Sequence, residues 1–521
     1  MMLARQRHAD PGGMTLKALV AGWAKIPEAW DRPVNGLALD SRQMRSGSVF
    51  LACPGYVSHG LLHARAAIEA GAAAVLYDAP PPDFDLKSLS GPAGVPVVSV
   101  PGLKQLLGPI AARFYGNPSR NRVVIGVTGT NGKTSCCHYL AQLWSTLGKS
   151  SAVMGTLGNG IWSHSRGELD EVSGGGRTTP DAVTVQAQLA DFDCPVVAME
   201  VSSHGLAQGR VNGVEFAGAV FTNLTRDHLD YHATMEDYAE AKLALFRIAS
   251  LKQVAVNLDD AFARNVLDEV TDMARVVVYS VKSSPQSLAE PNGWQWLWAR
   301  TIDSDAAGAA LDIESSWGQV SQHTTLMGRF NVSNVLAAMG ILLLGGERLQ
   351  VVADAVAGLR PVCGRMERFG GGDLPLVVVD YAHTPDALEQ VLKTLREYAK
   401  GRLICVFGCG GDRDPGKRPE MGRAAEQYAE RVILTDDNPR SEDGDYIIKG
   451  ILEGMLSPSI AHIERDREAA IRLAVREAGP GDIVLVAGKG HEVGQEVMGR
   501  VYPFSDRQQV SNCLGVANPH G

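Results

Sequence analysis

The feature that most constrains this chain is a glycine-rich turn between an apolar strand and a helix. Arg122–Val127 is a short apolar run typical of a buried strand, and Ser135–Leu147 has the pattern of a helix. In a strand–turn–helix unit of this kind, backbone N–H groups and the helix N-terminus hold phosphate oxygens, and glycines let the backbone approach them. The turn therefore predicts a nucleoside triphosphate site, with Lys133 on the β- and γ-phosphates and the Thr134 hydroxyl on Mg²⁺.

The turn departs from the strict phosphate-loop motif at one position. That motif has a glycine six positions before the lysine, where this chain has Val127, and we expect Gly126 and Gly129 to supply the flexibility instead. A glycine-rich turn without a ligand is the plainer alternative. The residues predicted to hold the nucleotide here are Gly129, Thr130, Asn131, Gly132, Lys133, Thr134 and Ser135.

Short strand-like runs alternate with helical stretches along the chain, and this predicts an α/β protein with mostly parallel sheets. The runs are Gly36–Leu39, Val49–Ala52, Ala74–Tyr77, Val97–Val100, Arg122–Val127, Val196–Val201, Ala217–Thr222, Leu376–Val379, Arg402–Phe407, Arg431–Leu434 and Ile483–Ala487. A length of 521 residues suits three domains, so we expect three tandem α/β domains. Their expected bounds are 1–118, 119–359 with a P-loop ATPase-like parallel sheet, and 360–521 with a Rossmann-like sheet. Two polar stretches, Leu157–Thr179 and Lys282–Gly293, are expected to be long loops.

Composition and charge exclude several classes of protein. The 49 Lys and Arg against 58 Asp and Glu give a net charge of −9, which disfavours nucleic acid or an anionic membrane surface as a partner. No apolar run approaches the ~18 residues of a membrane helix, and the first twenty residues lack the apolar core of a signal peptide. The eight cysteines have neither CxxC nor Cys/His zinc spacing, so we expect a reducing, cytoplasmic location.

Further along the chain, a series of short motifs resembles the Mur ligases of peptidoglycan synthesis. The motifs are Thr178-Thr179-Pro180, Met199-Glu200-Val201-Ser202-Ser203-His204, Asn223-Leu224-Thr225-Arg226-Asp227-His228-Leu229-Asp230, Gly328-Arg329-Phe330-Asn331, Gly364-Arg365-Met366-Glu367 and Asp380-Tyr381-Ala382-His383-Thr384-Pro385. The resemblance extends from Asp40-Ser41-Arg42 to Phe504-Ser505-Asp506-Arg507. Three stretches, Gly411–Asp414, Asp437–Arg440 and Gly488–Glu492, are similar to those of the MurE type, which adds the third residue of the stem peptide.

The resemblance implies ATP-driven formation of an amide bond. It implies that the carboxylate of UDP-N-acetylmuramoyl-L-alanyl-D-glutamate attacks the γ-phosphate of ATP and forms an acyl phosphate. The amine of meso-diaminopimelate then displaces the phosphate. Because a carboxylate and a polyphosphate repel each other, cations must gather where they meet, and ATP and Mg²⁺ are the implied cofactors.

The resemblance also implies catalytic and metal-binding roles. The implied catalytic residues are Lys133, His228 and Lys242, and the implied metal ligands are Thr134, Glu200, His228 and Lys242. The family lysine that matches Lys242 is carbamylated, which converts a cation into an oxygen ligand. Without the resemblance, Lys242 would be typical of a solvated helix face, and Glu200 of a solvated or capping carboxylate.

The remaining nucleotide and nucleotide-sugar contacts are assigned by the same resemblance. Asn331 and Asn334 would bind the adenine edge, Arg365 the phosphates and Asp380 the ribose, although the two asparagines equally fit a helix cap. The residues implied to bind the UDP-sugar peptide are Leu39 and Ser41 at the uridine, with Tyr56, Val57 and Ser58 nearby, and Thr178, Thr179, Ser202, Gln208 and Arg210 at the muramyl peptide. His59, His63 and Arg177 depart from the family pattern around these contacts.

The acceptor amino acid can be argued from charge. Diaminopimelate carries both a carboxylate and an ammonium at its far end, whereas L-lysine carries only the ammonium. Arg413 and Arg440 suit the carboxylate, and Glu492 with the Gly488 carbonyl suits the ammonium. Asp437, Asn438 and Pro439 complete the predicted acceptor site. Taken alone, Asp436–Arg440 would be typical of an ordinary polar loop.

Other functions remain open at this point. A folylpolyglutamate synthetase would share the turn and the acyl-phosphate chemistry, but it would lack the uridine-binding domain and the Asp437–Arg440 stretch. A P-loop regulator would leave Thr178–Pro180, Lys242 and Glu492 unexplained, and a scaffold role has no repeat to support it. We expect a monomer that binds small molecules, with no nucleic acid and no membrane insertion.

Overall fold

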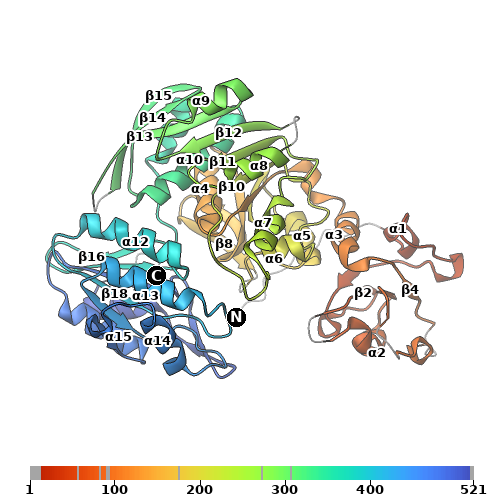
Figure 1. The fold of residues 1–521 in the computed structure, drawn as a ribbon. Helices are drawn as coiled ribbons and strands as arrows, with labels where there is room; N and C mark the ends of the chain where they lie inside the picture. The colour runs from red at the N-terminus through yellow and green to blue at the C-terminus, as the bar shows by residue number, and fades with distance from the viewer. Residues whose placement is uncertain are drawn as a thin grey trace. The chain divides into compact units, whose positions relative to one another are not determined.

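The computed structural model describes residues 13–55, 58–80, 84–89, 94–173, 177–270, 274–305 and 308–516 (Figure 1). The chain forms two compact units. Unit 1 comprises Met1–Gly126, Gly148–Ala219 and Arg247–Lys252, and unit 2 comprises Val127–Leu147, Val220–Phe246 and Gln253–Gly521. The chain passes between the units within β5 (Val123–Thr128) and within β10 (Gly218–Phe221). In the described ranges, no helix is long and apolar enough to span a membrane.

Unit 1 begins with a parallel sheet in the order β1-β2-β3-β4. Its elements are α1 (Leu16–Leu19), β1 (Gly36–Ala38), β2 (Ser48–Ala52), α2 (Ala64–Glu69), β3 (Ala74–Tyr77), β4 (Val97–Ser99) and α3 (Leu103–Phe114). Val49 and Leu51 of β2 pack in a core with residues of α1 and α3, and Phe50 and Ala52 pack in a second core with α2. Both faces of the sheet are therefore buried, as the continuous apolar run of β2 requires.

The rest of unit 1 contains five strands that lie side by side in a sheet in the order β5-β9-β6-β7-β8. The further elements are β6 (Ser151–Gly155), β7 (Gly158–Ser163), β8 (Glu168–Ser173), α5 (Ala182–Asp191), β9 (Val196–Glu200) and α6 (Ser203–Ala207). Strands β7 and β8 form an antiparallel hairpin, so the expectation of a long loop over Leu157–Thr179 is wrong. The glycines and serines of Leu157–Thr179 obscure the strand pattern in the sequence. Gly174–Gly176 lie outside the described residues.

The first part of unit 2 places strands in the order β10-β11-β12-β13-β14-β15. The elements are α4 (Lys133–Thr146), α7 (Met235–Leu243), β11 (Gln253–Asn257), α8 (Ala263–Glu269), β12 (Arg275–Ser280), α9 (Gln286–Ala289), β13 (Gln295–Asp305), β14 (Gly308–Ser315), β15 (Gly318–Thr324), α10 (Arg329–Leu344) and α11 (Leu349–Val356). Strands β11 to β13 are parallel, but β13, β14 and β15 form an antiparallel meander that was not predicted (Figure 1). Helix α10 is apolar almost all round because it packs between α4 and strands β11 to β13. The predicted loop Lys282–Gly293 contains α9 and a short 3₁₀ turn.

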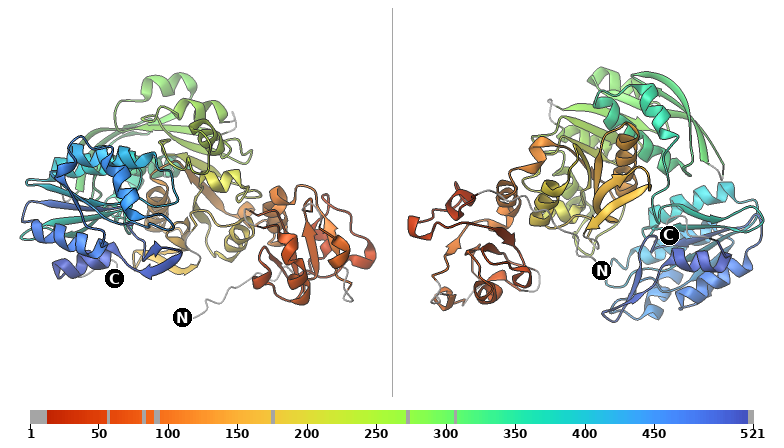
Figure 2. Two further views of the ribbon diagram at one scale, coloured as in Figure 1. Left: turned by 60° about the horizontal axis from the view of Figure 1, so that its bottom comes forward. Right: turned by 180° about the vertical axis from the view of Figure 1, so that it is seen from behind.

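The last part of unit 2 is a six-stranded sheet in the order β16-β17-β21-β18-β19-β20. Its elements are β16 (Glu367–Gly370), β17 (Leu376–Asp380), α12 (Pro385–Tyr398), β18 (Leu403–Phe407), α13 (Lys417–Tyr428), β19 (Arg431–Leu434), α14 (Gly444–Leu452), β20 (Ala461–Ile463), α15 (Arg467–Glu477), β21 (Ile483–Ala487), β22 (Gly494–Val497), β23 (Arg500–Pro503) and α16 (Asp506–Leu514). Within the six-stranded sheet all pairs are parallel except β16 with β17, and β22 and β23 form a separate antiparallel hairpin. Helices α12 to α14 pack on one face, and α15 and α16 on the other (Figures 1 and 2).

This sheet positions three of the predicted binding stretches. Gly411–Asp414 follows β18, Asp437–Arg440 follows β19 and Gly488–Glu492 follows β21. Since these strands are parallel, their carboxyl ends share one edge, which is where ligands bind in open α/β sheets. The predicted α/β fold class is confirmed, and each predicted strand lies within one or two residues of an observed one. The domain bounds at 118 and 359 stay a prediction.

Candidate active site

The glycine-rich turn runs from the end of β5 to Lys133, the first residue of α4. Gly129 has φ +151° and Gly132 has φ +86°, and neither position has room for a side chain. A Cβ on Gly129 would lie 1.8 Å from Thr222 Oγ1, and one on Gly132 would lie 2.6 Å from Asn334 Oδ1. Gly126 lies inside β5, so the expectation that it gives the turn flexibility is wrong. The turn depends instead on Gly129 and Gly132.

Neighbouring loops hold the turn in one conformation. The Asn131 backbone N–H donates to Asn223 Oδ1 at 2.8 Å, and Thr222 Oγ1 donates to the Asn131 carbonyl at 2.6 Å. Thr130 Oγ1 donates to the Thr225 carbonyl at 3.0 Å. Because these bonds fix the peptide planes, the loop is already organised to receive an anion.

Two cations lie at the turn. Lys133 Nζ donates to the carbonyls of Gly129 at 2.9 Å and Thr130 at 2.7 Å. Arg365 Nη2 donates to Thr134 Oγ1 at 3.3 Å. Ser135, the remaining predicted nucleotide-binding residue, is buried in the first turn of α4. The structure therefore gathers the positive charge that a polyphosphate requires.

Two buried hydroxyls at the turn have unused hydrogen-bonding capacity. Thr128 Oγ1 and Thr225 Oγ1 have no hydrogen-bond partner among the described residues. Buried hydroxyls normally have a partner, so these two oxygens fit a site that accepts a hydrated cation or a phosphate.

Lys242 lies on α7 with only 1% of its surface exposed, so its alternative interpretation as a solvated helix face is wrong. Its Nζ lies 4.2 Å from the centre of the Tyr238 ring, and the Tyr238 hydroxyl lies 3.1 Å from Thr130 Oγ1 at the turn. Burial, together with the charge of Lys133, lowers the pKa of the Lys242 amine well below its ordinary value. This shift favours the neutral, nucleophilic form of the amine.

His228 belongs to a cluster around the buried carboxylate of Asp227. Its Nε2 lies 3.4 Å from Asp227 Oδ2, and His383 Nε2 lies 3.7 Å from the same oxygen. Burial opposes the charge of Asp227, but the His383 hydrogen bond and the charges of His228, His383 and Lys417 outweigh it and hold the pKa well below its usual range. His228 has φ +56°, in the left-handed region that residues other than glycine rarely adopt.

The predicted adenosine-binding residues are engaged with protein groups. Asn331 accepts from Tyr139 Oη at 3.1 Å and donates to the Met327 carbonyl at 2.9 Å, and Asn334 Nδ2 lies 3.5 Å from Asn331 Oδ1. Asp380 accepts from the backbone N–H groups of Met366 and Ala382, both at 2.7 Å, and burial raises its pKa. Their arrangement shows structural roles on α10 and at the end of β17.

In unit 1, Glu200 ends β9 with only 1% of its surface exposed. Its carboxylate accepts from the Thr156 backbone N–H at 2.8 Å and from Thr156 Oγ1 at 3.0 Å, and Thr178 Oγ1 lies 3.1 Å from the Thr156 hydroxyl. Glu200 is therefore a buried and oriented carboxylate, and the solvated alternative is wrong.

The predicted muramyl-peptide residues surround Thr179. Its Oγ1 lies 3.1 Å from Ser202 Oγ, and its carbonyl accepts from Arg210 Nη1 at 2.7 Å. Arg210 also donates from Nε and Nη2 to Gln208 Oε1, at 3.0 and 2.6 Å. The structure therefore brings together the predicted residues from Thr178 to Arg210.

The predicted uridine residues lie at the carboxyl end of β1, where Leu39 and Ser41 are half-buried. Tyr56 and Val57 lie outside the described residues. The departing histidines have local roles: His59 Nδ1 accepts from the Leu61 N–H, and His63 Nε2 lies 3.3 Å from Ser58 Oγ. Arg177 is exposed.

The predicted acceptor residues meet at the carboxyl edge of the last sheet. Gly488 approaches Asp437 so closely that a Cβ would lie 2.4 Å from Asp437 Oδ2. Asn438 Nδ2 donates to Glu492 Oε2 at 2.9 Å. The loops after β19 and β21 therefore form one site.

Two arginines flank Gly410 on the neighbouring loop. A Cβ on Gly410 would lie 2.9 Å from Arg440 Nη1 and 3.7 Å from Arg413 Cγ. Arg440 Nη1 donates to the Gly411 carbonyl at 2.7 Å, and its Nε lies 3.2 Å from Glu496 Oε2. Its backbone has φ +55° and pairs with Glu496 and Met498 of the β22–β23 hairpin, so Pro439 and Arg440 turn the chain toward that hairpin.

Sequence reasoning missed three residues of these clusters. Lys489 is fully buried between Asn438 and Glu492, His383 faces Asp227, and Thr156 orients Glu200. Lys489 stands between two glycines and His383 lies in a quoted motif, which were the available signals. Thr156 had none, because its role depends on the unpredicted hairpin.

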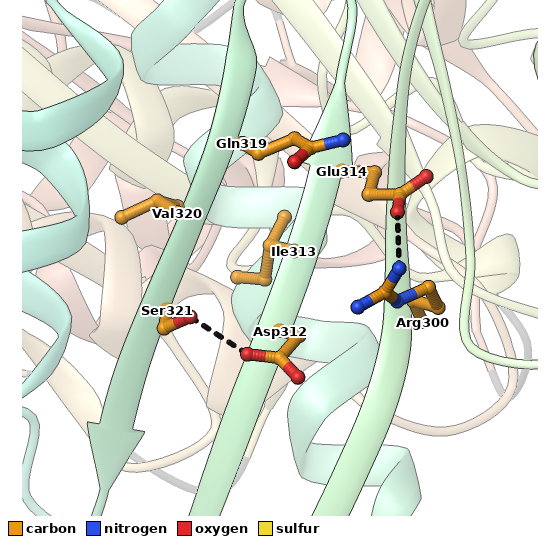
Figure 3. A pocket seen from close by; sticks show the side chains of 7 residues that line it. All are labelled: Arg300, Asp312, Ile313, Glu314, Gln319, Val320 and Ser321. Atoms are coloured by element: carbon orange, nitrogen blue, oxygen red, sulfur yellow. Dashed lines mark hydrogen bonds and ion pairs between the residues drawn. The ribbon is translucent and has the colours of Figure 1, made fainter.

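One hollow lies away from these clusters. It is a shallow depression on the β13–β15 meander, lined by polar side chains that pair with one another, such as Arg300 with Glu314 and Ser321 with Asp312 (Figure 3). Across the described part of the chain, no three His, Cys, Asp or Glu side chains form a metal-binding group. All eight cysteines are free thiols.

Comparison with known proteins gives a match along most of the chain. Three family models match in order: "Mur ligase family, catalytic domain" over residues 33–115, "Mur ligase middle domain" over 127–342, and "Mur ligase, glutamate ligase domain" over 364–490. Two similar curated proteins are the UDP-N-acetylmuramoyl-L-alanyl-D-glutamate–2,6-diaminopimelate ligases of Chromobacterium violaceum and Alkalilimnicola ehrlichii. The first is 49% identical and covers 92% of this chain and 94% of its own; the second is 47% identical and covers 96% and 99%.

Solved structures agree with this match. A structure of a UDP-N-acetylmuramoyl-L-alanyl-D-glutamate–2,6-diaminopimelate ligase has 36% identity and a TM-score of 0.66, covering 96% of this chain and 99% of its own. A MurF ligase from Thermotoga maritima in complex with ADP has 17% identity and a TM-score of 0.60, covering 89% and 95%, and it supports the fold alone. Because relatives nearly half identical span more than nine tenths of the chain, the chain belongs to the Mur ligase family.

Proposed function

We propose that this chain is an ATP-dependent ligase of the MurE type, which joins meso-diaminopimelate to UDP-N-acetylmuramoyl-L-alanyl-D-glutamate in the cytoplasmic stage of peptidoglycan synthesis. The observation that carries the proposal is the acceptor edge of the last sheet. There, a carboxylate (Glu492) and a guanidinium (Arg440) lie on loops that contact each other. This pair matches an amino acid whose far end bears both an ammonium and a carboxylate. The printed names of the relatives support the same acceptor.

ATP would bind with its phosphates at the turn. The N–H groups of residues 129–134 and the first turn of α4 would hold the phosphate oxygens, with Lys133 and Arg365 as the cations. Asn331, Asn334 and Asp380 would shape the adenosine site through the contacts they already make, while Tyr381 stacks against Arg365 at 4.2 Å.

Mg²⁺ fits the donors that these residues offer. The Thr134 hydroxyl and His228 would hold it, together with the orphaned hydroxyls of Thr128 and Thr225 through water. For Glu200, the resemblance to the Mur ligases alone suggests a role as a metal ligand. Bound there, Mg²⁺ would offset the charge of the phosphates and of the incoming carboxylate.

Lys242 would contribute to the same site after carbamylation. Its neutral amine attacks CO₂, a C–N bond forms and one proton leaves, which yields a carbamate anion with two oxygens. The buried location of the amine, beside Tyr238 and near the cation of Lys133, favours both the neutral amine and the anion that it becomes.

The nucleotide sugar would bind to unit 1. Leu39 and Ser41 would contact the uridine, and Thr178, Thr179, Ser202, Gln208 and Arg210 the muramyl peptide, with Arg210 as the partner of a carboxylate. The bounds proposed for the three domains are 1–118, 119–359 and 360–521, which assign the nucleotide sugar, ATP and the amino acid to successive parts of the chain.

The decisive experiment measures phosphate release from ATP with Mg²⁺ and the UDP-muramoyl dipeptide. The reaction is run with diaminopimelate, with L-lysine, and with no acceptor. We expect rapid release with diaminopimelate only, at least about a hundredfold faster than with lysine, because lysine lacks the far carboxylate that Arg440 would bind. Release that needs no acceptor, or equal rates with both amino acids, contradicts the proposal.

A further inference from the structure

Lys489 has no role in the proposed chemistry, yet it is one of the most completely buried charged side chains of the protein, with 0% exposed. It lies directly after β21 between Gly488 and Gly490, which both have positive φ. A Cβ on Gly490 would lie 2.7 Å from the Gly364 carbonyl and 2.9 Å from Tyr381 Cβ. The close passage of this loop therefore forces the lysine inward, and a buried ammonium must be paired to be tolerated.

The partners of this ammonium are the two side chains that link the acceptor loops. Lys489 Nζ donates to Asn438 Oδ1 at 2.9 Å and to Glu492 Oε2 at 2.9 Å. The backbone N–H of Glu496 donates to the same Asn438 oxygen at 2.9 Å. An ammonium has only donors, so it fixes which end of the Asn438 amide is the oxygen.

This fixed amide then orients the carboxylate. Since Oδ1 faces Lys489, Nδ2 faces Glu492 and donates to its Oε2 at 2.9 Å. Glu492 Oε2 thus accepts one hydrogen bond from the Lys489 ammonium and one from the Asn438 amide. Within the described ranges, no residue donates to Oε1, and 30% of the Glu492 side chain is exposed. One carboxylate oxygen is held while the other is presented outward.

We infer that Lys489 is a positioning residue for acceptor selection: it sets Asn438 and Glu492 so that Glu492 Oε1 meets the far ammonium of an amino acid with an ammonium and a carboxylate at that end. The inference rests on the proposed function and extends it, because it assigns selectivity for the far ammonium to a residue that contacts no substrate. Without the lysine, Asn438 Oδ1 and Glu492 Oε2 lose a shared donor, and the carboxylate can rotate away from the ligand.

The test compares diaminopimelate with 2-aminopimelate, which keeps the reacting amine and the far carboxylate but lacks the far ammonium. Phosphate release is measured at saturating ATP and UDP-muramoyl dipeptide, for the wild type, Lys489→Met and Lys489→Arg. The exposed Lys449 on α14 supplies the matched control, Lys449→Met. In the wild type we expect a preference for diaminopimelate of at least about a hundredfold in kcat/KM.

In Lys489→Met we expect this preference to fall at least about tenfold, through a higher KM for diaminopimelate, because the ammonium contact is lost and the remaining contacts stay. The KM values for ATP and the nucleotide sugar and the kinetics with 2-aminopimelate stay within about twofold, since Lys489 acts only through Glu492. Lys489→Arg keeps part of the preference, and Lys449→Met keeps all of it.

Glu492→Gln and the double variant Lys489→Met/Glu492→Gln test whether Lys489 acts on acceptor preference through Glu492. If Lys489 acts through Glu492, the double variant discriminates no worse than Glu492→Gln alone. Equal losses with both acceptors, or an unchanged preference in Lys489→Met, would overturn the inference. Lys489→Gln serves the same comparison if the methionine variant does not fold. A wild type without acceptor-dependent phosphate release would instead contradict the proposed function, so the two failures are distinguishable.

Discussion

At the scale of single residues, two of the buried lysines differ in what surrounds their amines. Lys242 has the face of Tyr238 at 4.2 Å, whereas Lys489 has two oxygen acceptors at 2.9 Å. The first environment favours a neutral amine that can react, and the second favours a fixed cation that orients its neighbours. The same residue type therefore serves two different purposes in one chain.

Replacing Lys242 with alanine tests its proposed carbamate. We expect phosphate release to fall at least about a hundredfold, because an oxygen ligand beside the developing charge is lost. Acetate or propionate should restore part of the rate, since a small carboxylate fits the space left by the lysine side chain. The measurement is phosphate release with increasing acid concentration, with Lys449→Ala as control. Normal activity of Lys242→Ala without any acid contradicts the prediction.

Replacing Arg440 with alanine tests the carboxylate contact. We expect the KM for diaminopimelate to rise about tenfold to a hundredfold, because a bidentate charged contact is lost, and the KM for ATP to stay unchanged. Arg472→Ala, on the exposed face of α15, is the matched control. The KM values are measured by steady-state kinetics with each substrate varied in turn. A rise in the KM for ATP equal to that for diaminopimelate would argue against this role of Arg440.

His138, on α4, should make stability depend on pH. Burial, with the nearby charge of Arg365, lowers its pKa to about 4. An unfolded chain has a histidine pKa near ~6.5, so between these values the unfolded state binds a proton that the folded state excludes. The free energy of unfolding therefore falls as pH drops from about 6.5 to about 4.

His138→Phe should lack this contribution. We expect its urea midpoint to fall less than that of the wild type between pH 7 and pH 4, by the equivalent of about 2–3 kcal/mol. Above pH 7 the two curves should run parallel. Urea titrations at four or five pH values provide the measurement, and parallel curves over the whole range would show that His138 is not the titrating group.

At the scale of elements, one buried ion pair holds the starts of both acceptor loops. Arg467 at the start of α15 and Asp506 at the start of α16 are fully buried and joined by two hydrogen bonds of 2.7 and 2.8 Å. Arg467 also donates to the carbonyls of Ala487 at 2.9 Å and Asp436 at 3.4 Å. Those carbonyls directly precede Gly488 and Asp437.

Arg467→Met should therefore loosen both the fold and the acceptor site. We expect the free energy of unfolding to fall by about 3–5 kcal/mol, because the Asp506 carboxylate is left buried without its partner. The double variant Arg467→Met/Asp506→Leu should lose less free energy of unfolding than Arg467→Met alone, since no unpaired charge remains. Urea unfolding gives both values. A double variant less stable than the single one would contradict this account.

The elements also show what could be predicted from the sequence. Strands such as β19 and β21 were predicted at their observed bounds, because parallel strands buried on both faces leave continuous apolar runs. The β7–β8 hairpin was not predicted, because its glycines and serines give no such run. The meander β13–β15 was not predicted either, because it alternates apolar and polar residues, as a strand with one solvated face does, and so lacks a continuous apolar run.

The same contrast holds for the site. The glycine-rich turn could be predicted because its chemistry is local in the chain. Lys489, His383 and Thr156 could not, because each acts on a residue at least three positions away, and up to 156 positions in the case of His383 with Asp227. The surroundings of Lys242 and Glu200 could not be predicted either, because the burial that rules out a solvated position for both side chains depends on the fold.

At the scale of the whole molecule, the 58 acidic side chains outnumber the 49 Lys and Arg and give a net charge of −9. We expect a monomer of 55.6 kDa, because the surface carries like charge that opposes self-association. Sedimentation equilibrium at about 0.15 M salt and again at about 1 M salt, where charges are screened, checks the expectation. A dimer at both salt concentrations would contradict it.

Apart from Arg413 on the loop after β18, the proposed acceptor residues lie within a single stretch of chain, from Asp436 to Pro503. Among the residues described, Asn438, Lys489, Glu492 and Glu496 form one connected set of hydrogen bonds, which Arg440 joins through Glu496. Replacing this stretch with that of a relative that uses another acceptor should therefore change the acceptor preference and leave the ATP-binding turn unchanged.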